Sequence, residues 1–349
     1  MAKKVLIIVP VFNGVAEFLG DCFSSLLKIN YPQDDYKILA IDDVSSDNSV
    51  EYIRKNFPEV EIIVNKKNLG FTGTNNVGLQ LAIDRCYDYA FMLNQDTTVE
   101  SDFLTQVVNL AETDGQIGAV QSKLLLHWDK TKINSIGNQI HFLGFAYAGG
   151  HLTPDRELTV REITYPSGAA VLLRVNALRD VGLLNQDFYM YHEDVDLGWR
   201  LWLGNWKVML APESVVYHKY EFSRSIQKYY FMERNRYLIL CQNYKIATIL
   251  LISPAALIMD LAMLIYSMIN GWFFEELRVY NYFFQPKVFK QVMLTRFSVQ
   301  KKRRVKDKEI VKRFIGRIDF QEISNPLLRY IGNPIFNLYW QIVKRIIWW

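Results

Sequence analysis

Short apolar runs alternate with amphipathic segments through the N-terminal part of the chain, and this alternation constrains the fold more than any other feature. Buried strands are expected at residues 4–10, 36–42, 60–65 and 89–93, with helices between them at 17–28, 49–56 and 74–86. Such spacing predicts a mostly parallel α/β sheet, in which ligands bind at the carboxyl ends of the strands. Two acidic clusters, Asp42-Asp43 and Asp96, fall at such ends.

The chain lacks the signatures of several other nucleotide-binding and metal-binding classes. The first strand leads into PVFNG rather than GxGxxG, and no P-loop occurs, so neither a dehydrogenase nor a P-loop enzyme is predicted. The three cysteines are scattered without CxxC spacing, which argues against a disulfide framework or a zinc site and fits a reducing compartment. The N-terminal apolar run is shorter than a secretory h-region, so we interpret it as the first strand.

Charge is divided unevenly along the chain. Residues 286–349 contain 15 of the 40 Lys/Arg but only 4 of the 36 Asp/Glu, a net charge of +11, so the preceding residues carry −7. A basic, aromatic tail on an acidic body suggests a polyanionic partner, which can be a phospholipid surface or a nucleic acid. Because no nucleic-acid-binding module is present, we predict an anionic membrane surface and no nucleic acid. RNA binding by the tail is the alternative hypothesis.

An apolar stretch at residues 246–274 precedes the basic tail. Asp260 is its only charge, and Ser253-Pro254 and Asn270-Gly271 are expected to interrupt it. The stretch is long enough to span a bilayer, but a single crossing would separate the basic tail from the body, which the positive-inside tendency disfavours. We therefore predict a re-entrant or in-plane helical pair with both ends cytoplasmic.

The tail also contains residues suited to a membrane surface. Its basic side chains are expected to contact anionic lipid, although a solvated helix face is the commonest fate of such a run. They are Lys301, Lys302, Arg303, Arg304, Lys306, Lys308, Lys312 and Arg313. Trp340, Trp348 and Trp349 are expected at the level of the lipid headgroups.

Seven sequence segments carry a more specific signal. In chain order they are VPVFNG, AIDDVSSDNS, NLGFTGTNNVG, MLNQDT, YPSGAAVLLR, GLLNQDFYMYHEDVDLGWRLW and APESVVYH. Their order and spacing resemble family 2 glycosyltransferases of the GT-A fold, especially the rhamnosyltransferase-like branch, over residues 4–240. The resemblance implies a Rossmann-like catalytic domain at 1–235, followed by a C-terminal membrane-associated helical region at 236–349.

The same resemblance implies an activity. The enzyme would invert the anomeric centre and transfer one sugar, since a QxxRW-like motif typical of processive relatives is missing from the sequence. The best guess for the donor is dTDP-L-rhamnose, with UDP-hexoses next. The acceptor would be a lipid-linked or cell-surface polysaccharide, such as a polyprenyl-diphosphate-linked glycan, at the cytoplasmic face of the cell membrane. A non-catalytic nucleotide-sugar- or lipid-binding protein of the same fold is the alternative.

The resemblance assigns donor binding to residues of the first four motifs. These are Pro10, Phe12, Asp42, Asp43, Asn68, Gly70, Asn75, Asn94 and Asp96. Asp96 matches the last acid of the DxD motif, which binds the diphosphate and a divalent metal, Mg²⁺ or Mn²⁺, and His218 would be a further metal ligand. Asn94 replaces the first acid of that motif, which should weaken metal binding. From the residues alone, a helix cap at Asp43 and a structural role for His218 are equally open.

The segment HEDVD supplies the predicted catalytic residues. By resemblance, Asp194 is the general base and Glu193 supports the site or positions the acceptor. Clustered carboxylates raise one another's pKa, which suits a base, although an acidic helix N-terminus is the structural alternative. The predicted acceptor-binding residues are Ser167, Gly168, Ala169, His192 and Trp199.

Overall fold

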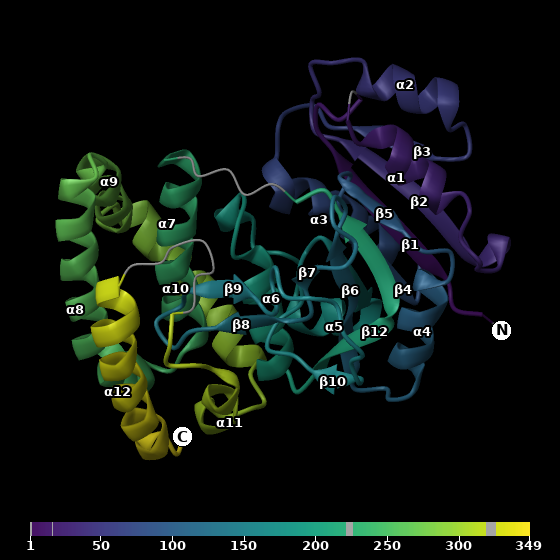
Figure 1. Cartoon of the computed structure of the whole chain (residues 1–349). Helices are drawn as coiled ribbons and strands as arrows, with labels where there is room; N and C mark the ends of the chain where they lie inside the picture. Colours follow the sequence, from purple (N-terminus) through teal and green to yellow (C-terminus); the bar gives the residue numbers. More distant parts are fainter. Residues whose placement is uncertain (1, 16, 221–225, 319–325) are drawn as a thin grey trace. The chain divides into compact units, whose positions relative to one another are not determined.

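The computed structural model describes residues 2–15, 17–220, 226–318 and 326–349. The chain forms two compact units, each with its own interior (Figure 1). Unit 1 comprises Met1–Asn138, Ala148–Leu201 and Trp206–Glu221, and unit 2 comprises Gln139–Tyr147, Trp202–Asn205 and Phe222–Trp349. The domain boundary predicted at 235/236 lies inside helix α7 (Ile226–Asn243).

Unit 1 is built on a ten-stranded sheet in the order β10-β12-β6-β11-β4-β1-β2-β3, with β5 added to β12 and β7 added to β6. Strands β1 to β4 are mutually parallel where they pair, whereas β11 is antiparallel to both β4 and β6. The strands are β1 (Val5–Val11), β2 (Tyr36–Asp42), β3 (Glu61–Val64), β4 (Tyr89–Leu93), β5 (Thr97–Val99), β6 (Ile117–Leu126), β7 (Ile133–Ser135), β10 (Arg161–Glu162), β11 (Ala170–Arg174) and β12 (Lys207–His218). A separate pair is formed by β8 (Asn138–Ile140) and β9 (Ala146–Ala148).

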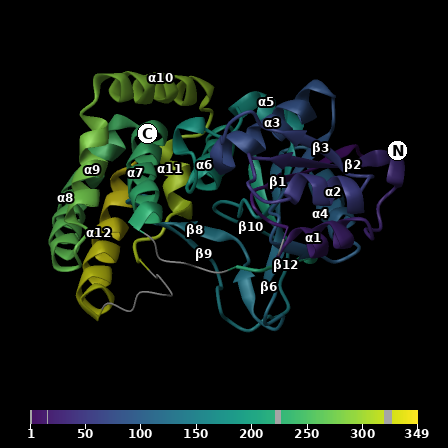
Figure 2. The same cartoon turned by 90° about the horizontal axis from the view of Figure 1, so that it is seen from above.

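Helices cover both faces of this sheet, as Figure 2 shows. They are α1 (Leu19–Leu26), α2 (Ser49–Asn56), α3 (Gly70–Asp84), α4 (Phe103–Glu112), α5 (Val175–Val181) and α6 (Glu193–Leu203), with 3₁₀ turns at Gln33–Asp35 and Gln186–Phe188. Strand β1 is buried on both faces. Its alternate side chains point to opposite sides of the sheet, and helices cover both sides. Val5 and Ile7 pack in the core on one face of the sheet. Ile8 points to the other face and packs against α3, where Gly78 allows a close approach.

The sequence-based elements of the first half are confirmed, with one difference at a helix start. Helix α3 begins at Gly70, several residues before the expected start at residue 74. The carboxylate of Asp43 accepts the backbone N–H groups of Leu69 and Gly70, so a side chain from the loop after β2 caps the N-terminus of α3. Local sequence could not reveal a cap donated from this distance along the chain.

Unit 2 is helical. Its helices are α7, α8 (Ile246–Ile269), α9 (Phe273–Phe283), α10 (Pro286–Lys302), α11 (Asp307–Ile310) and α12 (Asn333–Ile346), with short turns at Val311–Arg313 and Leu328–Gly332. Trp340 stacks on Phe142 with ring centroids 4.7 Å apart, and its Nε1–H donates to the carbonyl of Phe314. Trp340 is fully buried, so the prediction that it lies among lipid headgroups is wrong. Trp348 is exposed.

Helix α8 continues through Pro254, where the sequence suggested an interruption. Proline has no N–H for the carbonyl of Leu250, and the hydroxyl of Ser253 donates to that carbonyl instead, at 2.9 Å. The expected break at Asn270-Gly271 is observed, since α8 ends at Ile269 and Gly271 has φ +79°. Within the described residues, α8 is the one helix whose length and composition would allow it to cross a bilayer.

Candidate functional site

Asp43 organises the loop that precedes α3. Its Oδ1 accepts the side-chain amide of Asn65 at 2.9 Å and the N–H of Leu69 at 2.8 Å, and its Oδ2 accepts the N–H of Gly70 at 2.9 Å. The amide of Asn68 donates to the backbone carbonyl of Asp43. Three of the predicted donor-binding residues therefore form one hydrogen-bonded unit, in which Gly70 adopts the left-handed φ of +67° that favours glycine.

Asp42 and the loop after β1 lie beside this unit. Asp42 is buried at the end of β2, where its Oδ2 accepts the N–H of Ser45 and its Oδ1 has no partner among the described residues. The ring of Phe12 is half exposed, and its backbone N–H and carbonyl are both bonded by the side chain of Gln95. Gln95 thus ties the loop after β1 to the segment after β4, a role that we did not predict.

Asp96 and His218 meet at the ends of β4 and β12. The Nε2 of His218 lies 3.3 Å from Oδ1 of Asp96, an oxygen that is buried and accepts no hydrogen bond in the described part of the chain. The Oδ1 of Asn94 is likewise buried and without a partner there. Carboxylate, amide and imidazole atoms of this kind can hold a divalent cation. No cluster of three or more His, Cys, Asp or Glu side chains suited to a metal occurs among the described residues.

Glu193 and Asp194 begin helix α6. The Oδ2 of Asp194 accepts the N–H of Gly168 at 3.1 Å, and its Oδ1 accepts the N–H of Val195 at 2.8 Å. Glu193 is 6% exposed, and its Oε2 has no hydrogen-bond partner in the described chain. Burial raises the pKa of both carboxyls, and the charge of Asp194 raises the pKa of Glu193 further. The two N–H groups oppose this rise at Asp194, so Asp194 is the member of the pair that ionises more readily.

The segment 167–169 positions Asp194 through its backbone. The N–H of Ser167 donates to the buried side chain of Gln121 at 2.8 Å, which fixes the turn from which Gly168 reaches Asp194. The carbonyl of Ala169 accepts the N–H of Asn94 at 3.0 Å. This turn therefore connects the segment that contains Asp96 to the helix that contains Asp194.

Tyr189 joins the same helix start to the loop that Asp43 organises. Its hydroxyl donates to Oδ1 of Asn68 at 2.8 Å, its carbonyl accepts the N–H of Thr72 at 3.1 Å, and its ring packs against Gly70. Tyr189 has φ +64°, and Tyr191 and His192 also have positive φ, an unusual conformation for side chains of this size. Strain of this kind concentrates at functional sites. Tyr189 is not among the predicted site residues.

A continuous set of contacts therefore links the three carboxylates that the sequence singled out. Asp43 holds Gly70, and the neighbouring Phe71 lies close to Gly168, which bonds Asp194. Residue 169 bonds residue 94, two positions before Asp96. These contacts connect the three segments of unit 1 that carry Asp43, Asp96 and Asp194.

Several predicted site residues have their side chains in the interior. Asn75 and Trp199 are almost completely buried, and the amide of Asn75 donates to the carbonyl of Phe71 within α3. Trp199 is 1% exposed, so contact with an acceptor, predicted from the motif, does not occur in this conformation, and the side chain packs in the core instead. His192 is also buried, and Pro10 is partly so.

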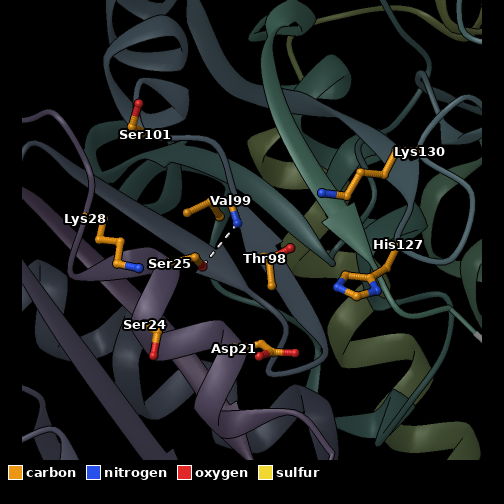
Figure 3. Close-up of a pocket in the computed structure, with 9 residues that line it drawn as sticks. All are labelled: Asp21, Ser24, Ser25, Lys28, Thr98, Val99, Ser101, His127 and Lys130. Carbon is orange, nitrogen blue, oxygen red and sulfur yellow. Dashed lines mark hydrogen bonds between the residues drawn. The ribbon is translucent and has the colours of Figure 1, made fainter.

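A pocket of about 470 Å³ opens between α1 and the ends of β5 and β6 (Figure 3). Its lining is polar and consists of Asp21, Ser24, Ser25, Lys28, Thr98, Val99, Ser101, His127 and Lys130. Lys28 and Lys130 extend toward it from opposite sides, as Figure 3 shows. None of the nine lining residues is among the predicted site residues.

The sequence profile of Glycosyl transferase family 2 matches residues 6–182. The match covers half of the chain, so the protein belongs to glycosyltransferase family 2, as predicted. Apart from Gln139–Tyr147, the matched residues fall within unit 1, which contains the ten-stranded sheet.

Two curated relatives show how this similarity is distributed. A poly(ribitol-phosphate) beta-glucosyltransferase of Bacillus spizizenii is 26% identical over 113 residues, which cover 31% of this chain and 17% of that protein. An N-acetylglucosaminyl-diphospho-decaprenol L-rhamnosyltransferase of Mycobacterium tuberculosis is 36% identical over 73 residues, covering 21% of this chain and 22% of that protein. The chain thus aligns with only a small part of each relative.

Solved structures extend the likeness to the fold. S. aureus TarS 1-349 in complex with UDP has a TM-score of 0.51 and 14% identity, covering 98% of this chain and 90% of that chain. GalNAc-T7 with UDP, GalNAc and Mn²⁺ has a TM-score of 0.56 and 15% identity, covering 68% and 47%. At such identities the likeness concerns the fold alone, and the predicted GT-A fold is confirmed.

Proposed function

We propose that this glycosyltransferase inverts the anomeric centre of its donor and transfers one sugar, with Asp194 as the general base. The observation that supports this most is the state of Asp194, whose carboxylate is oriented by two backbone N–H groups while burial raises its pKa. A base whose pKa lies closer to neutrality than that of a free aspartate transfers protons more effectively in solution near neutral pH. Glu193, buried beside it, is proposed to support the site and to orient the acceptor.

The proposed reaction is a single displacement. Asp194 takes the proton of an acceptor hydroxyl as that oxygen forms a bond to the anomeric carbon, and the nucleoside diphosphate leaves with the electrons of the broken bond. Attack from the face opposite the leaving group inverts the configuration. The hydrogen-bonded loop of Asp43, Asn68 and Gly70 is proposed to hold the nucleoside, so that the reacting atoms are aligned before transfer.

We propose Asp96 and His218 as ligands of a divalent cation, Mg²⁺ or Mn²⁺. The buried Oδ1 of Asp96 without a hydrogen-bond partner and the adjacent imidazole nitrogen are a donor set that fits such an ion. When bound, the ion would neutralise the charge that develops on the departing diphosphate. Asn94, with its unpartnered carbonyl oxygen, is a neutral candidate for a further ligand. A likeness to GalNAc-T7, whose structure contains UDP and Mn²⁺, is consistent with this assignment.

We propose dTDP-L-rhamnose as the donor, followed by UDP-hexoses, and a polyprenyl-diphosphate-linked or cell-surface glycan as the acceptor. The relative from Mycobacterium tuberculosis, an L-rhamnosyltransferase of a decaprenol-linked substrate, supports the first choice. The Bacillus relative, a beta-glucosyltransferase, and the UDP complex of TarS support the second.

The donor and the metal can be tested together. Purified protein is incubated with dTDP-L-rhamnose, UDP-glucose and UDP-N-acetylglucosamine, with and without Mn²⁺ or Mg²⁺, and release of the nucleoside diphosphate and the melting temperature are recorded. We expect one donor to be hydrolysed slowly and to raise the melting temperature, more strongly with metal. Binding without any turnover on glycan acceptors would contradict the proposed reaction.

We propose that unit 2 attaches the enzyme to the cytoplasmic face of the cell membrane, without crossing it. Exposed apolar side chains run along α12 at Ile335, Leu338, Ile342 and Ile346, and a similar row follows α8. The only charge in α8, Asp260, is neutralised by Arg236 at 3.1 Å, so the helix presents no unpaired charge to lipid. Such faces suit helices that lie in the membrane plane.

The basic residues of the tail contribute unequally to this surface. Arg303 is bound internally by Asp307 and the carbonyl of Asn243, so the expectation that it contacts lipid is not supported. Lys301 and Lys302 are exposed and remain candidates for anionic headgroups.

Vesicle flotation tests the membrane proposal. Leu338→Ser/Ile342→Ser should weaken binding to phosphatidylglycerol-containing vesicles roughly 100-fold, because each lost side chain contributes about 1.5 kcal/mol. Gln341→Ser, on the same helix, is the matched control and should bind normally. Equal flotation of both variants would remove α12 from the membrane-binding surface.

A further inference from the structure

His218 is held by a second residue that the motifs do not contain. Asn134 lies in β7, and its Oδ1 is 3.0 Å from Nδ1 of His218. Strands β7 and β12 both pair with the last residues of β6, which brings these two side chains together across the sheet. Both side chains are buried, with 5% and 6% exposure, so a donor or acceptor left unpaired here would be costly.

The amide of Asn134 also contacts His151. Its nitrogen lies 3.5 Å from Nδ1 of His151, a contact in which the imidazole nitrogen is the acceptor. The amide oxygen of Asn134 faces Nδ1 of His218. The ring of Tyr220 packs near both imidazoles, with centroid distances of 5.6 Å to His218 and 5.5 Å to His151.

An amide oxygen can only accept a hydrogen bond, so it requires the proton of a neutral His218 to be on Nδ1. The other ring nitrogen, Nε2, then has a free lone pair. That lone pair faces Oδ1 of Asp96 at 3.3 Å, and two acceptors at this distance do not bond each other. Oδ1 of Asp96 has no hydrogen-bond partner among the described residues.

We infer that Asn134 is a positioning residue that holds His218 in the Nδ1-protonated tautomer, so that Nε2 is available as a ligand. The inference rests on the proposed metal site and adds a residue to it. Metal-binding histidines generally donate their second N–H to an oxygen of the protein, and loss of that oxygen typically weakens metal binding about 10- to 100-fold. No motif pointed to Asn134, because it precedes His218 by a long stretch of sequence.

The inference predicts different outcomes for two substitutions at one position. Asn134→Leu keeps the shape of the side chain but removes the acceptor oxygen. The proton of His218 should then move to Nε2 and form a hydrogen bond to Asp96, so that neither of these two proposed ligands is available to a metal. Asn134→Asp keeps an acceptor oxygen and should restore the native tautomer. Asn138→Leu is the matched control, because Asn138 is a buried asparagine nearby that bonds Ser135 and not His218.

Two measurements test this, one of which needs no metal. The protein has five histidines, so ¹⁵N-histidine labelling with long-range ¹H–¹⁵N correlation can assign the tautomer of His218 in metal-free protein. The spectra are recorded at about pH 8.5, above the range in which histidine ordinarily titrates. We expect Nδ1-protonated His218 in the wild type, Asn134→Asp and Asn138→Leu, and Nε2-protonated His218 in Asn134→Leu. A wild-type His218 protonated on Nε2 would overturn the inference.

The second measurement is a titration with Mn²⁺ followed by electron paramagnetic resonance. Asn134→Leu should bind Mn²⁺ about 10- to 100-fold more weakly than the wild type, with Asn134→Asp near the wild type. Wild-type affinity in Asn134→Leu would overturn the positioning role. Failure of the wild type to bind Mn²⁺, with the tautomers as expected, would instead reject the proposed metal site and leave the role of Asn134 in orienting His218 supported.

Discussion

Two clusters of acidic side chains, one in each unit, have opposite surroundings. In unit 2, Glu233 and Asp260 bond the guanidinium of Arg236, which is itself almost completely buried. In unit 1, Glu193 and Asp194 are neighbours, and among the described residues no Lys or Arg charge lowers the pKa of either. Buried acids without a cation cost folding free energy, which makes Glu193 and Asp194 candidates for chemistry that needs a raised pKa, whereas Arg236 links Glu233 of α7 to Asp260 of α8.

The largest expected effect is on catalysis, from Asp194→Asn. The amide cannot accept a proton, so kcat should fall about 10²- to 10⁴-fold while donor affinity changes little. Initial rates with the donor identified by the screen, together with calorimetric titration of that donor, measure both. Asp84→Asn, an exposed acid on α3, is the control and should keep normal turnover. Normal turnover in Asp194→Asn would remove the distinction between the two pairs.

A large effect on stability, but not on chemistry, is expected from Arg236→Met. It leaves Glu233 buried without its cation, which should reduce the free energy of unfolding by about 3–5 kcal/mol. Lys312→Met is the control, because the Lys312–Glu309 pair is mostly exposed, with side-chain exposures of 60% and 48%, and should change stability by less than about 1 kcal/mol. Urea unfolding measures both. Equal stability of the two variants would mean that the Arg236 cluster is not what holds unit 2 together.

The smallest expected effect is on the pH dependence of stability, from Glu193→Gln. Because the pKa of Glu193 is raised in the folded protein, the folded chain keeps a proton that the unfolded chain releases. This group therefore lowers the free energy of unfolding as the pH rises above about 4.3, the ordinary pKa of a glutamate. Glu193→Gln should therefore gain melting temperature relative to the wild type as the pH is raised through the neutral range. Glu59→Gln, at an exposed site, should show no such trend. Parallel curves for Glu193→Gln and the wild type would indicate that Glu193 ionises normally.

The parts of the site that could be predicted are those fixed by neighbouring residues in the sequence. The strand ends that carry Asp43 and Asp96, and the helix start that carries Asp194, follow from local periodicity, since a buried strand and an amphipathic helix leave patterns that can be read directly. Trp199 was misassigned because a motif indicates which residues recur together and not which way each side chain points. Within α6 that position faces the core.

The parts that could not be predicted are contacts between distant segments. Tyr189 reaches Asn68, and Asn134 reaches His218, through pairings set by the sheet and by the loops around it. An asparagine or tyrosine has no pattern of its own by which its partner could be recognised. The cap that Asp43 provides to α3 belongs to the same class.

The sequence by itself determined the α/β alternation and the family, and it singled out three carboxylates as candidates for the site, because burial periodicity and motif spacing are local properties of the chain. Only the tertiary structure decided which acids lack a cation, which histidine nitrogen faces Asp96 and which tail residues are buried. Burial and hydrogen-bond satisfaction depend on all the groups that surround an atom, and most of those groups come from elsewhere in the chain.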